Sequence, residues 1–486
     1  MRIHPIGEAG VVEETESRDP NDFSRGGIPQ AILRMAFPLI LAQVLNVLYN
    51  IVDRMYIGRI PGSGRDALTG LGVCFPIITL INAFAVLAGN GGAPLASIER
   101  GAGNLLGARR IMGNSFTLLI MFGVSCTALF FSIKEIVLTT FGASAVTLPY
   151  ADEYLSIFLM GTPAVMVAVG MNPFINMQGF AKAGMMTVAA GALLNAALDP
   201  LFIFAFGMGV RGAALASVIS QYVSAAWALR FLTGGRVTLK LRLAEMKPDF
   251  EIIKRILTLG FSNFVMSLTE SAVQLTLNST LALFGGDLYV GVMTVVNSVR
   301  QVVMLPASGF SQAASPVIGF NYGAKKYSRV KAAVRFMMIG CFSYSILAWA
   351  LTMLAPAALI RVFNKDPALI EAGVTSARQY FALFFVISLQ MVGQNGFLSL
   401  GKARHAIFFS FLRKGVIVIP MALLLPRLGL GVAGVFLAEP ISDVVGSTAC
   451  FVTFMLTQWR MLTREEKAAD GSSSGGVTLP PSANSR

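Results

Sequence analysis

The sequence predicts an all-α polytopic membrane protein with twelve transmembrane helices in two six-helix lobes. Three observations support this: the composition, a series of long apolar runs, and an internal repeat. Of the 486 residues, 55% are hydrophobic and only 13% are charged, with a mean hydropathy of +0.68. Soluble domains carry about 25% charged residues. The composition excludes a soluble enzyme, a secreted disulfide-rich protein and a disordered protein.

The apolar runs are separated by glycine, proline and charged residues. Each run is long enough to supply the roughly 20 residues that a hydrocarbon core of about 30 Å requires. The predicted spans begin near Ile32, Asp66, Ile111, Tyr150, Lys182, Arg211, Arg255, Leu288, Lys331, Arg378, His405 and Leu430. We expect flexible tails at residues 1–31, which are polar and acidic without a cleavable signal, and at residues 460–486, which are rich in Ser and Gly after Lys467.

The distribution of Lys and Arg predicts the orientation of the spans. If the N-terminus is inside, the inner loops and tails hold 26 of the 38 basic residues and the outer loops hold 8. Cytoplasmic loops are enriched in Lys and Arg. We therefore expect a multi-pass protein of the plasma (cell inner) membrane with both termini cytoplasmic. The net charge of +13 and the pI of 9.8 reflect this orientation, and we expect no nucleic-acid partner.

An internal repeat relates the two halves of the chain. A shift of 222 residues aligns residues 207–220 with 429–442, with eight identities in fourteen positions. An even number of spans separates the copies, so the repeat is parallel rather than inverted. We expect an N-lobe at 32–232, a cytoplasmic linker at 233–254 and a C-lobe at 255–459, with a cleft between the lobes.

Polar residues form stripes on three of the predicted helices. Each stripe has helical spacing and lies on one helix face. The stripes comprise Gln43, Asn46, Asn50 and Asp53; Asn195 and Asp199; and Asn263, Ser267, Glu270, Gln274 and Asn278. Amides and hydroxyls in spans also serve as interhelical hydrogen-bonding groups, and this alternative remains open for Gln43, Asn46 and Asn278. The buried carboxylates Asp53 and Asp199 are candidates to bind a proton or a cation.

Other features narrow the function. Pro38 and Pro200 each remove a backbone donor and permit a helix to bend. The chain has no GxxxxGK[ST] phosphate loop and no His, Glu or Asp constellation with zinc-ligand spacing, so we expect neither an enzyme nor a cofactor. The four cysteines fall in apolar runs and are expected to be buried. Arg413 and Lys414 sit within a span, where they could lock the lobes together or face the cleft.

Three motifs give the chain a resemblance to a known family. LYNIVDRMYIG from Leu48, NAALDPLFIF from Asn195 and GFNYGAKK from Gly319 resemble signatures of the multidrug and toxic compound extrusion (MATE) transporters. The resemblance extends from about Ile32 to Trp459. It implies an antiporter for multidrug efflux, and hence antibiotic resistance, that exports cationic or amphipathic small molecules in exchange for H⁺ or Na⁺ by alternating access.

The resemblance also implies roles for particular residues, closest to the bacterial DinF-like branch. The cation or proton site of the N-lobe falls on Asp53, Asn172, Asn195, Asp199 and Ser217. The bending proline falls on Pro38. Oxygen ligands of this kind suit a proton or Na⁺, and no other metal is expected.

One position departs from the family pattern. The sodium-coupled NorM-like branch pairs a seventh-span Glu, matched by Glu270, with a tenth-span Asp, where this chain has Leu389 followed by Gln390. We therefore expect coupling in the N-lobe. The candidate substrate-cavity residues are Gln43, Asn46, Asn50, Glu270, Gln274 and Asn278. Glu439 and Asp443 could be either functional groups or structural hydrogen-bonding groups.

Two other functions are compatible with the predicted fold class. A lipid-linked glycan flippase of related fold would need a basic cluster for the pyrophosphate. The basic residues within spans, Arg54, Arg300, Arg413 and Lys414, are not evidently convergent in the sequence. A membrane receptor or scaffold would explain the hydropathy but not the acidic spans of a duplicated architecture. The expected partners are small-molecule substrates and the lipid bilayer, and the chain is expected to be a monomer.

Overall fold

The computed structural model describes residues 21–474, and the regular structure in this range is helical. Apolar segments in a bilayer satisfy their backbone polar groups internally, which favours helices. The first half of the chain forms α1 (Ile28–Gly58), α2 (Gly64–Gly101), α3 (Leu105–Thr140), α4 (Leu148–Met160), α5 (Thr162–Asn176), α6 (Ala181–Pro200), the π-helical segment η1 (Leu201–Ala205) and α7 (Val210–Thr233).

A connecting segment with one short 3₁₀ turn, η2 (Leu243–Glu245), leads to the second half. That half begins with α8 (Phe250–Gly323), α9 (Tyr327–Leu354), α10 (Pro356–Phe363), α11 (Pro367–Tyr380), η3 (Phe384–Val386) and α12 (Ile387–Ser399). It continues with α13 (Ala403–Phe411), η4 (Leu412–Val418), α14 (Ile419–Leu425), η5 (Pro426–Leu430), α15 (Gly431–Ser442), η6 (Asp443–Ser447), α16 (Thr448–Phe454), η7 (Met455–Trp459) and α17 (Arg460–Ser474).

The helices account for the twelve predicted spans. Eight helical segments are long and apolar enough to cross a membrane, and two further spans are the bent pairs α4–α5 (58°) and α11–α12 (44°). Two of the eight, with 74 and 67 residues, are far longer than a bilayer needs. Gly286 breaks the first at φ 67°, and Gly429 and Gly431 break the second at φ 96° and 50°. Each therefore holds two spans, which confirms the predicted fold class.

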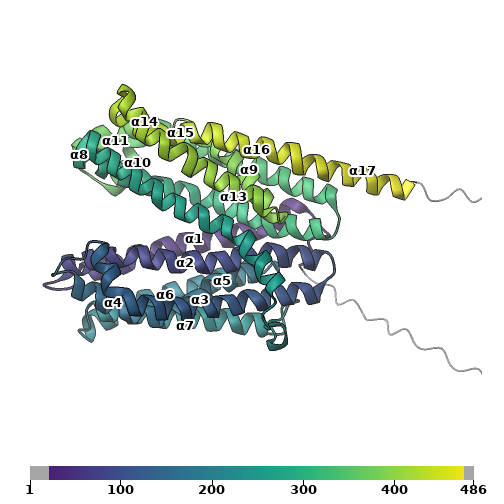
Figure 1. Cartoon of the computed structure of the whole chain (residues 1–486), viewed down its shortest axis with the longest axis horizontal. Helices are drawn as coiled ribbons and strands as arrows, with labels where there is room; N and C mark the ends of the chain where they lie inside the picture. Colours follow the sequence, from purple (N-terminus) through teal and green to yellow (C-terminus); the bar gives the residue numbers. More distant parts are fainter. Residues whose placement is uncertain (1–20, 475–486) are drawn as a thin grey trace, which may run out of the picture.

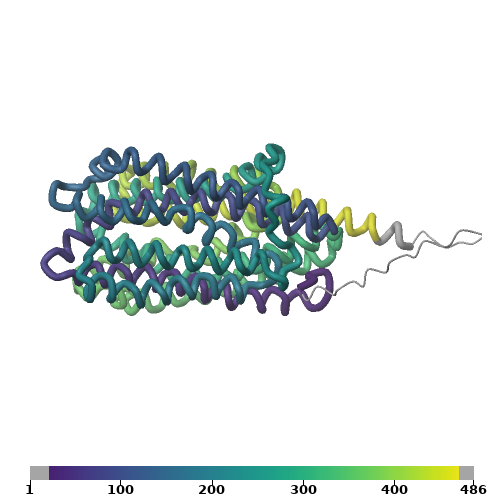
Figure 2. The backbone as a smooth tube through the Cα atoms, turned by 90° about the horizontal axis from the view of Figure 1, so that it is seen from below, coloured from purple at the N-terminus to yellow at the C-terminus, as the bar shows by residue number. Residues whose placement is uncertain are grey.

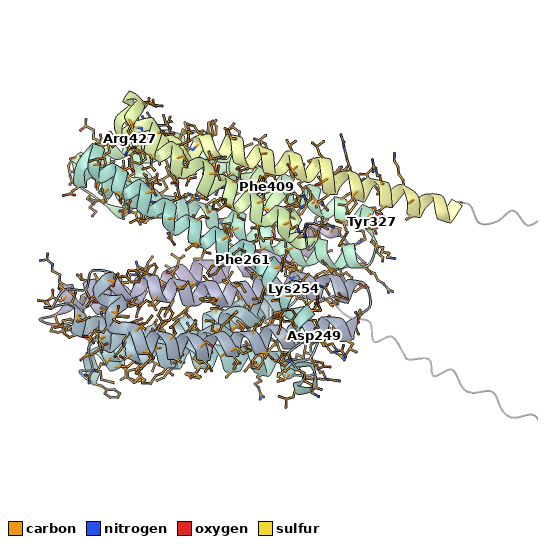
Figure 3. All side chains as sticks on the ribbon, viewed as in Figure 1. Asp249, Lys254, Phe261, Tyr327, Phe409 and Arg427 are labelled. Atoms are coloured by element: carbon orange, nitrogen blue, oxygen red, sulfur yellow. The ribbon has the colours of Figure 1, made fainter. Side chains whose placement is uncertain are left out.

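The spans form two groups. Figure 1 shows α1–α7 gathered below and α9–α17 above, with α8 passing from one group to the other. The groups lie close together at the end where both described chain ends lie, and they diverge toward the opposite end. The view at 90° in Figure 2 also places both ends of the chain at one end of the bundle. Figure 3 locates Asp249 and Lys254 near this end, and Arg427 at the opposite end.

The two groups meet where α2 packs against α8, and glycine permits the approach. A Cβ built on Gly260 of α8 would collide with the backbone oxygen of Leu87, and one on Gly323 with that of Ile98. On the α2 side, a Cβ on Gly101 would collide with the backbone of Phe320. Small residues allow close backbone packing in membranes, where van der Waals contact replaces the hydrophobic driving force.

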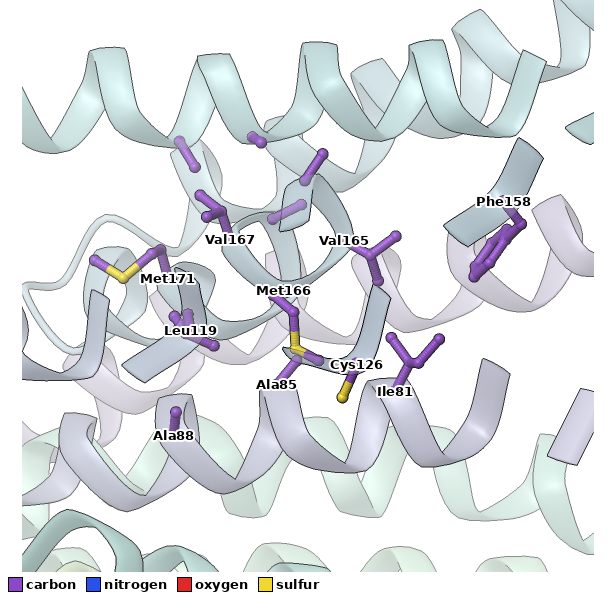
Figure 4. Close-up of a cluster of buried hydrophobic side chains, with 14 of the residues drawn as sticks. Ile81, Ala85, Ala88, Leu119, Cys126, Phe158, Val165, Met166, Val167 and Met171 are labelled. Atoms are coloured by element: carbon purple, nitrogen blue, oxygen red, sulfur yellow. The ribbon is translucent and has the colours of Figure 1, made fainter. Parts of the chain in front are cut away.

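The core of the first group lies between α2, α3 and α5. Figure 4 shows side chains of these helices interdigitating, including Ala85, Leu119 and Met166, each of them fully buried. Gly89 and Gly170 bring α2 and α5 together, because a Cβ on Gly89 would meet the Gly170 backbone. This packing holds α2, α3 and α5 together as a unit.

The sequence repeat corresponds to a structural repeat. Gly207 and Gly429, which the 222-residue shift aligns, both have positive φ, at 65° and 96°. Gly209 and Gly431 are likewise aligned, with φ of 56° and 50°. Only glycine adopts such conformations without a steric cost. The shared glycines therefore mark the same turn between the last two spans of each lobe.

The chain ends differ from the flexible tails we expected. Residues 1–20 and 475–486 lie outside the described residues, but residues 21–27 pack against the helices. The Phe23 ring lies 5.8 Å from the Phe320 ring, and Arg329 donates to the backbone oxygens of Phe23, Arg25 and Gly26. Residues 460–474 form α17, with an ion pair between Lys331 and Glu466 at 2.6 Å. Tertiary contacts outweigh the polar composition of these segments.

Candidate functional site

A buried polar cluster lies among α1, α6 and α7. These three helices pack against one another, and each presents polar residues at helical spacing toward the others. The hydroxyls of Tyr49 and Ser217 lie 3.3 Å apart. The Asn195 amide joins the cluster when its nitrogen donates to Asp199 Oδ2 at 3.0 Å and its oxygen accepts from Ser217 Oγ at 3.2 Å. Asp53 lies one helical turn beyond Tyr49 on the same face of α1, and its side chain is buried.

The carboxylates of this cluster are buried without a basic partner. Asp53 and Asp199 are 7% and 0% exposed, and neither forms an ion pair within residues 21–474. Asp53 Oδ1 has no hydrogen-bond partner in the same part of the chain. Arg54 instead places its guanidinium 5.0 Å from the centre of the Phe75 ring. Two carboxylates, a hydroxyl and an amide oxygen suit a proton or a hard cation such as Na⁺.

The structure brings together four of the five residues expected at the N-lobe ion site. Asn172 makes its hydrogen bonds elsewhere, donating to the Gly184 backbone oxygen at 2.9 Å and accepting from Asn176 at 2.8 Å. Tyr49, which the sequence analysis missed, belongs to the cluster. Its spacing of four residues from Asp53 places both on one face of α1, and this signal could have identified it.

The two prolines expected to permit bending occupy different local structures. α1 continues without a break through Pro38, from Ile28 to Gly58. Pro200 ends α6, and the π-helical segment η1 follows it directly. A π-helical turn widens the backbone and often occurs at functional sites. Asp199 therefore lies immediately before an irregular segment, whereas Asp53 lies on a regular helix.

A cavity of about 550 Å³ lies between the two lobes. Its walls come from α1, α2 and α5 on one side, and from both halves of α8, α12 and η4 on the other. Of the expected cavity residues, Gln43 and Glu270 line it. Asn46, Asn50, Gln274 and Asn278 do not, and Asn50 donates to the Asn46 backbone oxygen at 2.7 Å.

The C-lobe wall of the cavity carries a network of charges that we had not predicted. Arg300 pairs with Glu270 at 3.0 Å, Lys414 with Glu439 at 2.6 Å, and Arg413 with Asp443 at 2.5 Å. The members of this network come from α8, η4, α15 and η6. Both Arg413 and Lys414 line the cavity, as does Arg300.

This network corrects one expectation. The sequence analysis did not predict that the basic residues within spans converge. In the structure, however, Arg300, Arg413 and Lys414 meet at one wall. Arg54 lies elsewhere, against Phe75. The sequence held a usable signal, because two adjacent bases in one span face two acids, one turn apart, in the next. Leu389 stands at the tenth-span position in place of an acid, and the neighbouring Gln390 lines the cavity.

Comparisons with known proteins agree with this architecture. The MatE family model matches residues 38–201 and 263–424. The chain is 22% identical to the multidrug export protein MepA of Staphylococcus haemolyticus, over 89% of this chain and 95% of that protein. It is 24% identical to the probable multidrug resistance protein NorM of Thermotoga maritima, over 90% and 95%. A solved structure described as the outward-facing conformation of a multidrug resistance MATE family transporter matches with a TM-score of 0.84 and 23% identity, over 92% of this chain and 98% of that one.

Proposed function

Because the chain belongs to the MatE family, whose members are membrane transporters rather than enzymes, we propose that it is a secondary active multidrug efflux antiporter. It exports amphipathic or cationic compounds in exchange for H⁺ or Na⁺. The curated relatives named as multidrug export and multidrug resistance proteins support the export role. The proposal places ion binding and substrate binding at two separate sites.

The observation that carries the proposal is the unneutralised pair Asp53 and Asp199. Burying an isolated charge in a membrane protein is costly, so such residues bind an ion, a proton or a partner. No basic side chain within residues 21–474 pairs with either of them. An ion or proton bound among Asp53, Asn195, Asp199 and Ser217 would relieve the repulsion between the carboxylates and draw α1 toward α6.

Coupling follows from the position of α1. This helix carries Tyr49 and Asp53 toward the ion site and Gln43 toward the cavity. A movement of α1 that accompanies ion binding therefore changes the shape of the cavity. Pro38, five residues before the cavity residue Gln43, is where the missing backbone donor permits α1 to bend. Ion entry and substrate exit are thereby linked through a single helix.

The arrangement of the lobes supports alternating access. The lobes touch through the glycines of α2 and α8 at the end where both chain ends lie, and they diverge at the other end. With the termini cytoplasmic, as the distribution of Lys and Arg favours, this is an outward-facing state. The inward-facing state would require the α2–α8 contact to open. The proposed unit is a monomer in the lipid bilayer.

The alternative function is a lipid-linked glycan flippase. Arg300, Arg413 and Lys414 converge on the cavity, and this convergence supports a flippase more strongly than the sequence alone does. Each of these bases is neutralised by an acid, however, whereas the two N-lobe carboxylates have no counter-charge. The unpaired acids fit ion-coupled antiport better, and a flippase has no requirement for them.

Dye efflux tests the proposed function. Asp53→Asn and Asp199→Asn are expressed in drug-hypersensitive cells at matched levels, with Asp66→Asn as the control because Asp66 is only half-buried and lies at the start of α2, outside the cluster. We expect ethidium efflux to fall to the background rate in the two site variants and to persist in the control. Full efflux by both site variants would exclude the N-lobe coupling mechanism.

A further inference from the structure

The charged groups on the cavity wall have an unequal balance. Four ionisable side chains line the cavity: Glu270, Arg300, Arg413 and Lys414. One is acidic and three are basic, so the lining residues carry an excess of two positive charges, although Glu270 is the most exposed of the four. The two acids that offset this excess, Glu439 and Asp443, lie behind the wall and are 3% and 4% exposed.

Two of the three lining bases are neutralised by acids that are not among the lining residues. Lys414 and Arg413 are held in place by short ion pairs with Glu439 and Asp443. A buried ion pair keeps both partners charged, because removing either charge leaves the other uncompensated. Arg413 and Lys414 are among the residues that line the cavity, whereas Glu439 and Asp443 are not. A substrate cation would encounter one carboxylate, Glu270, which already pairs with Arg300.

Arg300 is the base that a substrate can reach. Its side chain is 15% exposed, compared with 9% for Arg413 and 2% for Lys414. A guanidinium has five N–H donors in a fixed planar fork. Within the described part of the chain, Arg300 uses one of these donors, in a hydrogen bond to Glu270. The Glu270 side chain is 49% exposed and can turn away toward the solvent-filled space.

We propose that Arg300, backed by Lys414 and Arg413, forms a subsite for the acidic group of an amphipathic substrate. The acidic group is a carboxylate or a phosphate, and it takes the place of Glu270 on the Arg300 fork. This inference rests on the proposed function, since it assigns a substrate class to the same cavity. Arginine binds both carboxylates and phosphates through two parallel N–H···O hydrogen bonds.

The rest of the cavity suits an amphipathic body attached to such a group. Met177, Met266, Met304 and Met391 line the walls. Methionine is flexible and polarizable, and it adapts to apolar groups of varied shape. The amide nitrogens of Gln43 and Asn263, also on the wall, have no hydrogen-bond partner within residues 21–474.

A matched pair of probes tests the subsite. The full chain in nanodiscs is titrated with 11-(dansylamino)undecanoic acid and with its neutral methyl ester, and dansyl fluorescence reports binding. We expect the acid to bind at least about tenfold more tightly than the ester. Arg300→Gln should weaken the acid to the affinity of the ester and leave the ester unchanged, and Arg300→Lys should recover part of the loss. The control is Arg427→Gln, which changes an exposed base far from the cavity.

A second variant keeps the test informative if Arg300→Gln does not fold. Glu270→Gln removes the carboxylate that competes for Arg300, so we expect it to tighten binding of the acid several-fold and not of the ester. A misfolded protein cannot produce that gain. Equal affinity of the wild-type chain for acid and ester overturns the proposal, as does acid binding that is unaffected by both Arg300→Gln and Glu270→Gln.

Parallel arms separate this inference from the function on which it rests. Ethidium export is measured with the same wild-type protein in proteoliposomes. Ethidium export without a preference for the acid overturns the subsite alone, whereas a preference for the acid without any export overturns the antiporter and leaves the subsite standing. Competition by dodecyl phosphate or by short-chain phosphatidic acid in the membrane then supports a soluble or a lipid-borne source of the acidic group.

Discussion

Ser217 and Glu439 lie 222 residues apart and occupy equivalent positions in the two lobes. Ser217 on α7 contacts Asn195 of the preceding span, and Glu439 on α15 contacts Lys414 of the preceding span. The same shift aligns Gly191 with Arg413 and Ser224 with Gly446. Gly191 lies close to Ser224 in the N-lobe, and Arg413 lies close to Gly446 in the C-lobe. The glycine is therefore on the first helix of one contact and on the second helix of the other. In the N-lobe, this duplicated helix pair thus holds a neutral hydroxyl beside two acids that have no basic partner. In the C-lobe, the equivalent pair holds a neutralised charge network.

The ion pair between Glu439 and Lys414 should be sensitive to loss of one partner. Both side chains are buried, at 3% and 2% exposure, so Lys414→Met leaves Glu439 with only the longer contact to Arg413, at 3.9 Å. We expect a loss of about 3–5 kcal/mol in the free energy of unfolding. Thermal unfolding in detergent measures it. The double variant Lys414→Met/Glu439→Gln should recover most of the loss, and a double variant no more stable than the single one would disprove the pairing.

The hydroxyl of Ser217 should matter for ion affinity. It lies within hydrogen-bond distance of both Tyr49 and Asn195. Ser217→Ala removes an oxygen from the proposed ion site and leaves its neighbours unsatisfied, which costs about 1–3 kcal/mol. We expect the ion concentration for half-maximal dye efflux to rise about tenfold, and Ser217→Thr to behave like the wild type. An unchanged half-maximal concentration for Ser217→Ala would remove Ser217 from the site.

The glycine contact between the lobes predicts a contrast between two similar variants. A Cβ at Gly260 would meet the Leu87 backbone, whereas a Cβ at Gly72 has nothing within 4 Å. Overpacking of this kind costs about 1–3 kcal/mol, while alanine in an open helical position favours the helix. We expect Gly260→Ala to lower the thermal unfolding temperature and Gly72→Ala to hold or raise it. If both variants unfold at the same temperature as the wild type, the lobes do not meet at Gly260.

Residues 21–27 should be released when Arg329 is changed. Arg329 donates to the backbone oxygens of three of these residues, at 2.9–3.0 Å. Arg329→Gln cannot reach all three, so trypsin should cleave after Arg25 several-fold faster than in the wild type. Arg335→Gln is the control, since Arg335 contacts Trp459 on another helix. Equal cleavage rates in Arg329→Gln and the wild type would contradict the contact.

The spans and the repeat could be predicted because hydropathy and glycine spacing are local properties of the chain. Helical spacing placed Asp53 on one polar stripe and Asn195 and Asp199 on another, and the family resemblance implied that the two stripes share one N-lobe site. The depth of a residue along its helix was not predictable in this way. Gln43 and Asn50 share one face of α1, but only Gln43 reaches the cavity. Which turn of a helix faces a cavity depends on how the lobes tilt. The spacing of polar residues along a helix does not depend on this tilt and cannot predict it.

The charge network and the packed N-terminal segment were missed for a different reason. Pairing of Arg413 with Asp443 depends on the rotation of two helices about their axes, and π-helical segments in both helices alter that rotation. Phe23 sits in a polar, acidic segment whose composition favours disorder. Its ring packs against Phe320, almost three hundred residues away in the sequence. Interactions over such a separation leave no local pattern.

Ion-driven efflux in vesicles tests the central claim, that Asp53 and Asp199 bind the coupling ion. Proteoliposomes are prepared with a Na⁺ gradient at clamped pH, or with a pH gradient in the absence of Na⁺, and ethidium transport is followed in each. We expect at least one of the two gradients to drive transport by the wild-type chain, and Asp53→Asn and Asp199→Asn to abolish the transport that it drives. Wild-type rates in both variants, or wild-type transport that ignores both gradients, would contradict the claim.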